Sequence, residues 1–206
     1  MKAHQNLSGH ALGSVDPASN IARRIFDEQV AMLFQRSTAT IVVGVPFALL
    51  ISWGLLPYVD ATAVWGWFAL RCAVTAGRVW LREAFLKSDR SDMVRWERRI
   101  VALLALDGFI WGLAGTWLLP VGRHDIVAML LTSLLGVSAL SAFGQHARWR
   151  AAMAHIVPMI LPAAALQLVS TNVLGAYIGV GLLLFVFLLA RESADAQARI
   201  APIARV

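Results

Sequence analysis

Charged residues and cysteines are both scarce in this sequence of 206 residues. Only 15% of the residues are charged and 59% are hydrophobic, with a mean hydropathy of +0.68. A typical soluble domain has roughly 25% charged and about 45–50% apolar residues, so a soluble core could not take up this excess. The single cysteine, Cys72, excludes an internal disulfide and leaves the redox compartment open.

Catalytic and cofactor-binding motifs are missing as well. The sequence contains no phosphate-binding glycine loop, no HExxH, no nucleophile elbow, no CxxCH and no nucleotide-binding fingerprint. His146 and His155 could titrate or hold a metal, but no further ligand has a suitable spacing. We therefore expect no catalytic residue, no cofactor and no metal site, and a protein that is not an enzyme.

Long apolar stretches dominate what is present. Six of them reach or approach the roughly 20 residues that a helix needs to cross a bilayer: residues 38–59, 62–81, 100–119, 126–146, 151–169 and 173–190. Helices are expected because backbone groups in lipid must be hydrogen-bonded within their own segment. The sequence thus predicts an all-α integral membrane protein, with a six-helix transmembrane domain over 38–190, an N-terminal segment over 1–37 and a tail over 191–206.

The distribution of basic residues predicts the orientation. Fifteen of the 18 lie in the N-terminal segment, the second and fourth loops and the tail, whereas the three opposite loops hold only Arg123. By the positive-inside rule both ends lie in the cytoplasm, which predicts a multi-pass protein of the bacterial inner (plasma) membrane. The net charge of +6 is then explained by topology, and no nucleic-acid partner is expected.

Tryptophans fall close to both predicted membrane surfaces, where amphipathic rings prefer to lie. Trp65, Trp67 and Trp117 are expected at the outer surface, and Trp80, Trp96 and Trp149 at the inner one.

Residues 19–35, ahead of the first span, have the pattern of an amphipathic helix. Such a helix either lies on the inner leaflet or packs against the cytoplasmic loops or a partner protein. The sequence does not separate these alternatives.

Three charged residues lie inside the predicted second and third spans. Arg71 is roughly 13–14 Å below the outer surface at 1.5 Å per residue, and Asp107 is roughly 10 Å from the inner one. Arg78 is seven residues from Arg71 and shares its helix face. We expect a buried ionic cluster of Arg71, Arg78 and Asp107, which serves either as a ligand, proton or switch site, or as a structural ion pair with Arg78 reaching the inner interface.

Small residues and prolines mark other contacts between helices. Small residues recur at four-residue spacing on the third and sixth spans: Gly108, Gly112, Thr116, Gly175 and Gly179. They predict close helix packing, either within the chain or across a homodimer. Pro158 and Pro162 are expected to kink the fifth span, because each removes a backbone donor.

Several segments together resemble the N-terminal multi-helix membrane input regions of bacterial GGDEF diguanylate cyclases and sensor histidine kinases. The matching segments, within residues 24–192, are Glu28-Gln29-Val30, Leu33-Phe34, Leu70-Arg71, Arg78, Gly108-Phe109-Ile110-Trp111-Gly112, the proline-containing fifth span and Leu189-Ala190-Arg191-Glu192. The resemblance implies a region that relays a signal through its last helix to a cytoplasmic output domain. No GGDEF, EAL or kinase domain follows the sixth span here.

The leading hypothesis is therefore a membrane-embedded signal-input module that acts through a cytoplasmic signalling partner or a lost output domain. Its expected partners are the lipid bilayer, the cytoplasmic output protein and, as one alternative for the glycine faces, a second copy of the chain. A small integral membrane transporter component and a structural membrane subunit are the alternatives.

Overall fold

The computed structural model describes residues 17–120, 122–145, 148–170 and 173–203, and this part of the chain is helical without strands. The six helices are α1 (Pro17–Leu55), α2 (Ala61–Lys87), α3 (Met93–Ala114), α4 (His124–Gly144), α5 (Trp149–Leu168) and α6 (Val173–Ile203). The predicted all-α fold is confirmed.

Local sequence explains where two of the helices begin. The side chain of Asp60 accepts a hydrogen bond from the backbone N–H of Ala63 at 2.9 Å, which caps α2. Asp92 caps α3 in the same way through the N–H of Arg95 at 3.0 Å. Each aspartate satisfies a backbone donor that has no partner within the first turn of its helix.

Three helices are long and apolar enough to cross a membrane: α4, α5 and residues Val173–Asp195 of α6. In α1 the apolar stretch Val43–Leu55 is shorter. Charged residues explain why α2 and α3 are not among the three, because Arg71 and Arg78 lie inside α2, and α3 begins with a charged turn and contains Asp107.

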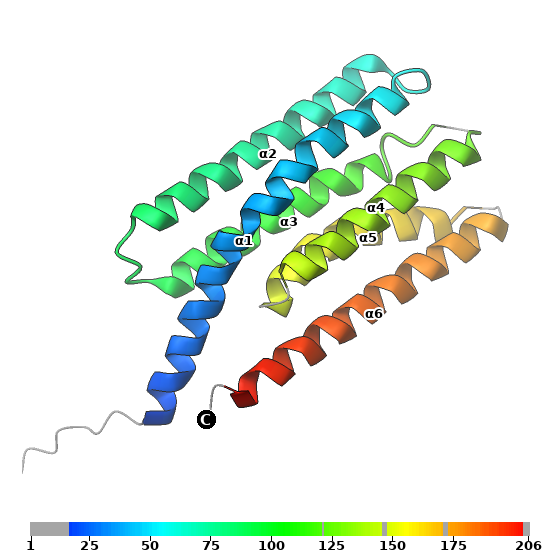
Figure 1. The fold of residues 1–206 in the computed structure, drawn as a ribbon. Helices are drawn as coiled ribbons and strands as arrows, with labels where there is room; N and C mark the ends of the chain where they lie inside the picture. The colour runs from blue at the N-terminus through cyan, green and yellow to red at the C-terminus, as the bar shows by residue number, and fades with distance from the viewer. Residues whose placement is uncertain (1–16, 121, 146–147, 171–172, 204–206) are drawn as a thin grey trace, which may run out of the picture.

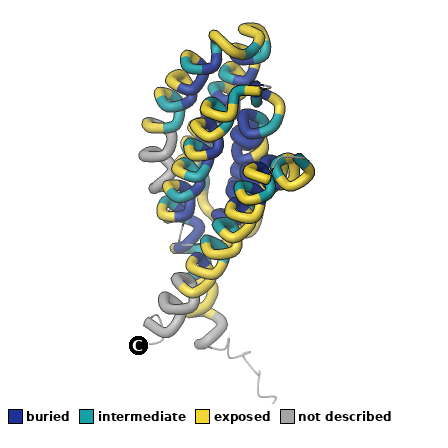
Figure 2. Tube along the Cα trace, turned by 90° about the vertical axis from the view of Figure 1, so that its right-hand side faces the viewer, coloured by how far each residue is buried: buried dark blue, intermediate teal, exposed yellow. Residues whose placement is uncertain are grey.

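The helices form an elongated bundle in which α1 and α2 lie together as a hairpin and α6 lies at the opposite edge (Figure 1). Helix α5 is the most buried of the candidate spans and packs against both α3 and α6. Buried residues face the interior of the bundle and exposed ones line its outside (Figure 2). Many of the exposed residues are large and apolar, among them Trp53, Trp80 and Phe143.

The amphipathic segment 19–35 is part of the long helix α1. Its apolar residues Val30, Leu33 and Phe34 are buried in a cluster with the end of α2 and the first half of α3. The ring of Phe34 stacks on Phe85 with centroids 4.0 Å apart, and Trp96 meets both rings edge-on. These contacts favour packing against neighbouring helices over lying flat on a leaflet.

A polar contact holds the same end of the bundle together. Arg148, which precedes α5, pairs with Glu97 of α3, donates to Gln29 of α1 at 3.2 Å and lies 4.8 Å from the centroid of the Phe26 ring. Arg148 thus connects the N-terminal half of α1 to α3 and to the start of α5.

The predicted small-residue faces lie at contacts within the chain. A Cβ on Gly108 would overlap the backbone carbonyl of His155, and one on Gly112 would lie 2.6 Å from the carbonyl oxygen of Pro158. On α6, a Cβ on Gly179 would lie 3.0 Å from the carbonyl oxygen of Ala164, and one on Gly175 would be equally close to that of Gln167. Both glycine pairs therefore allow a neighbouring helix to approach α5 closely.

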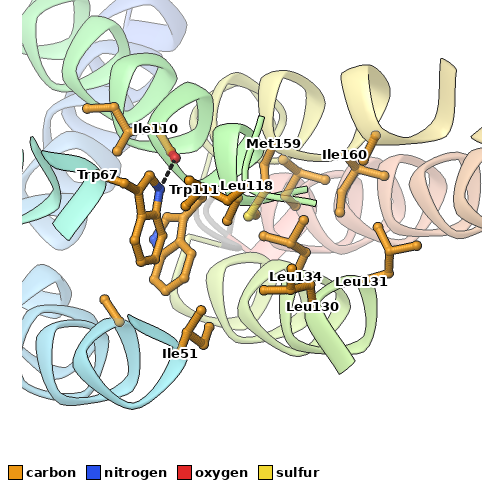
Figure 3. Close-up of a cluster of buried hydrophobic side chains, with 14 of the residues drawn as sticks. Ile51, Trp67, Ile110, Trp111, Leu118, Leu130, Leu131, Leu134, Met159 and Ile160 are labelled. Atoms are coloured by element: carbon orange, nitrogen blue, oxygen red, sulfur yellow. Dashed lines mark hydrogen bonds between the residues drawn. The ribbon is translucent and has the colours of Figure 1, made fainter. Parts of the chain in front are cut away.

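Trp67 faces the interior of the bundle and not its outside. Its side chain is fully buried between α2 and α3, where its indole Nε1–H donates to the carbonyl oxygen of Ile110 at 2.6 Å (Figure 3). Trp65, Trp80, Trp117 and Trp149 are exposed. Position along the helix led to the prediction for Trp67, but the direction in which its side chain points was decided by how α2 packs against α3.

Candidate functional site

The buried charges of α2 and α3 meet at Asp107. The guanidinium of Arg71 pairs with Oδ1 of Asp107, and Nη1 of Arg78 donates to Oδ2 at 3.0 Å. All three side chains are buried, with no more than 6% of any one exposed. Seven residues are about two helical turns, so Arg71 and Arg78 project from one face of α2 on either side of the carboxylate. The three residues predicted to cluster are thus in contact.

His155 of α5 adds a fourth side chain to this cluster. Its Nδ1 lies 3.6 Å from Oδ2 of Asp107 and 3.1 Å from the carbonyl oxygen of Leu104. Because a carbonyl only accepts, Nδ1 carries the hydrogen of that bond. The absence of a side chain on Gly108 brings α5 close enough for this contact. The sequence analysis named His155 but did not place it beside Asp107. That His155 and Asp107 both lie a short way into an apolar stretch was the one feature of the sequence that could have indicated their contact.

Aromatic rings complete one wall of the site. The guanidinium carbon of Arg71 lies 4.6 Å from the centroid of the Trp111 ring, a cation–π contact. The buried Trp67 packs edge-on against Trp111 with centroids 5.6 Å apart (Figure 3). Sequence reasoning assigned neither ring to this site, although Trp111 follows Asp107 by one helical turn and so shares its face.

A cavity of about 170 Å³ lies against the charged cluster. The cluster residues Arg71, Arg78, Asp107 and His155 line it together with Trp111. The rest of its wall comes from two further helices: Val43, Gly44 and Phe47 of α1, and Gly136, Val137, Leu140 and Ser141 of α4. Val43 and Leu140 are 56% and 58% exposed, so the cavity opens on the side of the bundle between α1 and α4.

The charges in this wall do not balance. Among the residues that line the cavity, two arginines accompany one carboxylate, so the lining carries a formal surplus of one positive charge when His155 is neutral. Positive charge in excess of the nearby carboxylates attracts anions, and the attraction is strong where water is largely excluded. In addition, Nε of Arg71 and Nε2 of His155 have no hydrogen-bond partner among the residues that the structure describes. The wall therefore suits a further anionic or polar group.

The remaining predicted residues lie away from this cavity. Pro158 and Pro162 are inside α5, which remains one helix from Trp149 to Leu168. Thr116 follows α3 and donates to the carbonyl oxygen of Gly112 at 3.1 Å. His146 lies outside the described residues. Within the described ranges, no three His, Cys, Asp or Glu side chains are grouped closely enough to hold a metal ion.

Comparison with known proteins found no matching family model, no matching curated protein and no matching solved structure.

Proposed function

We propose that all six helices cross the bacterial inner membrane, with both ends of the chain in the cytoplasm. The charges that lower the hydropathy of α2 and α3 are paired at Asp107 and buried, so they would not face lipid. The first three helices also expose large apolar side chains, among them Leu50, Trp53, Leu70, Trp80, Leu106 and Phe109. The one-sided distribution of basic residues supports the orientation.

We further propose that the chain is a non-enzymatic signal-input module that senses a ligand within the membrane and acts on a cytoplasmic output protein. One observation carries this proposal: a buried cluster with a surplus positive charge lines a cavity that opens sideways. A purely structural ion pair would need only one arginine for Asp107 and no adjoining cavity. The resemblance to input regions of cyclases and kinases points to the same role.

A route from the cavity to the end of the chain passes through α5 and α6. Helix α5 carries His155 into the cluster, and its C-terminal half packs against Gly175 and Gly179 of α6. Helix α6 then continues to Ile203, beyond its apolar part. A ligand that shifts His155 would therefore shift the helix against which α6 packs.

To test the signal-input role, we would fuse a diguanylate cyclase reporter domain after Val206 of the full chain. Its output would be measured in cells across pH, osmolarity and added carboxylic acids. We expect at least one condition to change the output about fivefold or more, the usual range of allosteric coupling. Replacing Arg71 by Gln should abolish this response, whereas Arg99→Gln, on the outside of α3, should retain it.

A flat response from the correctly inserted protein would contradict the signal-input role. The charge swap Arg71→Asp with Asp107→Arg tests the structural alternative. If the swapped protein is expressed and responds as before, the cluster only holds α2 and α3 in register. Uptake into vesicles that depends on pH and is lost in Asp107→Asn would instead indicate a transporter.

A further inference from the structure

We infer that the cavity binds an anionic amphiphile: a carboxylate or phosphate head lies beside Arg71 and Arg78, and an apolar tail leaves between α1 and α4. This inference rests on the proposed function in one respect, since it names the ligand of the same site.

Charge identifies the head group. The surplus positive charge of the cluster would be neutralised by one anion, and guanidinium groups bind carboxylate and phosphate oxygens through directed hydrogen bonds. The side chains of Arg71 and Arg78 both line the cavity, so a head group there lies against two guanidinium groups. A cationic head would meet two arginines, and a neutral head would leave the surplus charge uncompensated.

Size limits how much of the ligand enters. The cavity of about 170 Å³ resembles in volume the engineered cavity of roughly 150 Å³ that accommodates benzene in another protein. It can therefore hold a carboxylate or phosphate head and a few methylene groups, but not a whole acyl chain.

The side walls indicate where the rest of the ligand lies. Phe47 and Val137 give the cavity apolar walls, and the exposed side chains of Val43 and Leu140 form its rim. If α1 and α4 both cross the bilayer, this rim faces acyl chains. A tail that leaves there stays in an apolar medium, whereas a soluble anion would have to cross that medium to reach the arginines.

Binding can be tested on the purified full chain in a neutral detergent at pH 8. Decanoate is the probe. Decanol has the same apolar tail without the charge, and inorganic phosphate has the charge without the tail. Thermal unfolding is followed by tryptophan fluorescence, and bound molecules are counted by native mass spectrometry. We expect one decanoate bound per chain and a rise in Tm that depends on its concentration, because a ligand of the folded state stabilises it. Decanol and phosphate should have neither effect.

Two variants connect binding to the cavity. Gly136 lies in the cavity wall, and a Cβ added there meets no atom within 4 Å, so Gly136→Leu should narrow the cavity without disturbing the fold. Gly181→Leu on α6 is the matched control, since its Cβ is equally unhindered and lies outside the cavity. Arg71→Gln removes the surplus charge. We expect both variants to weaken decanoate binding at least about tenfold: Arg71→Gln removes a charge-assisted bond, and Gly136→Leu occupies part of the ligand's space. Gly181→Leu should leave binding unchanged.

Equal stabilisation by decanol would show that charge is irrelevant, and equal stabilisation by phosphate would show a soluble anion site; either result overturns the inference. Unchanged binding in both Gly136→Leu and Arg71→Gln would also overturn it. The two proposals fail separately. Specific decanoate binding without any reporter response refutes the signal-input role alone, whereas a reporter response without decanoate binding refutes the ligand assigned here.

Discussion

At the scale of single residues, Asp107 determines how the charges in the bundle interior are balanced. Its two carboxylate oxygens serve two arginines from α2, and His155 of α5 lies 3.6 Å from one of them. Because two arginines share one carboxylate, removing an arginine and removing Asp107 have different effects on the charge balance. Removing Arg71 leaves a one-to-one pair of Arg78 and Asp107, whereas removing Asp107 leaves two buried cations facing each other.

This difference predicts an order of stability. Asp107→Asn should destabilise the protein by about 3–5 kcal/mol, the usual cost of leaving buried charge uncompensated. Arg71→Gln should cost clearly less, because the bond from Arg78 to Asp107 at 3.0 Å remains. Thermal unfolding in detergent and the yield of monodisperse protein measure both effects. The prediction fails if Arg71→Gln is as destabilising as Asp107→Asn.

At the scale of helices, the contact between α3 and α5 positions the site. Gly108 lies against the backbone of His155, and Gly112 against that of Pro158. Pro162 has no N–H to donate to the carbonyl of Pro158, so that carbonyl lacks its helical donor where Gly112 of α3 packs against it. The glycines and prolines of these two helices therefore belong to one packing arrangement.

Substituting the glycines tests this packing. Gly108→Ala places a methyl group onto the backbone of α5, which cannot move as a flexible side chain would. We expect a loss of about 1–3 kcal/mol or more, as for overpacked cores, measured by chemical or thermal unfolding. Gly136→Ala is the control, because its methyl group meets no atom within 4 Å and alanine favours helix. Equal stability of the two variants would contradict a tight contact between α3 and α5.

At the scale of the whole molecule, the proposed topology has six membrane-spanning helices, three more than composition alone indicates. Helices α4, α5 and α6 qualify by their own composition. For α2 and α3 the argument depends on tertiary structure, since their central charges are acceptable in a membrane only when paired inside the bundle.

Cysteine labelling decides between these topologies. In a Cys72→Ser background, Thr62→Cys lies at the start of α2 and Ser91→Cys in the loop before α3; both positions are exposed. If α2 spans the membrane as proposed, a membrane-impermeant maleimide should label Thr62→Cys in intact spheroplasts and Ser91→Cys only after lysis. Labelling of both positions from the same side would show that α2 does not span.

The helices and the ionic residues could be predicted from the sequence because both follow from patterns along the chain. Apolar length predicts a helix, and the spacing of Arg71 and Arg78 predicts a shared face. Trp67 and His155 show where such reasoning stops. Their depths could be estimated from their positions, but whether a side chain meets lipid or another helix depends on how the helices rotate against one another.

The sequence by itself therefore determined an apolar, helical protein with three charges at similar depths on two neighbouring helices. Only the tertiary structure decided that Asp107 serves both arginines, that His155 and Trp111 join them, and that a cavity opens beside them between α1 and α4. The physical reason is that hydrophobicity and helical period act within one segment. The partners of the buried Asp107 come instead from two other helices, α2 and α5, brought together by close approaches such as that of Gly108 to α5.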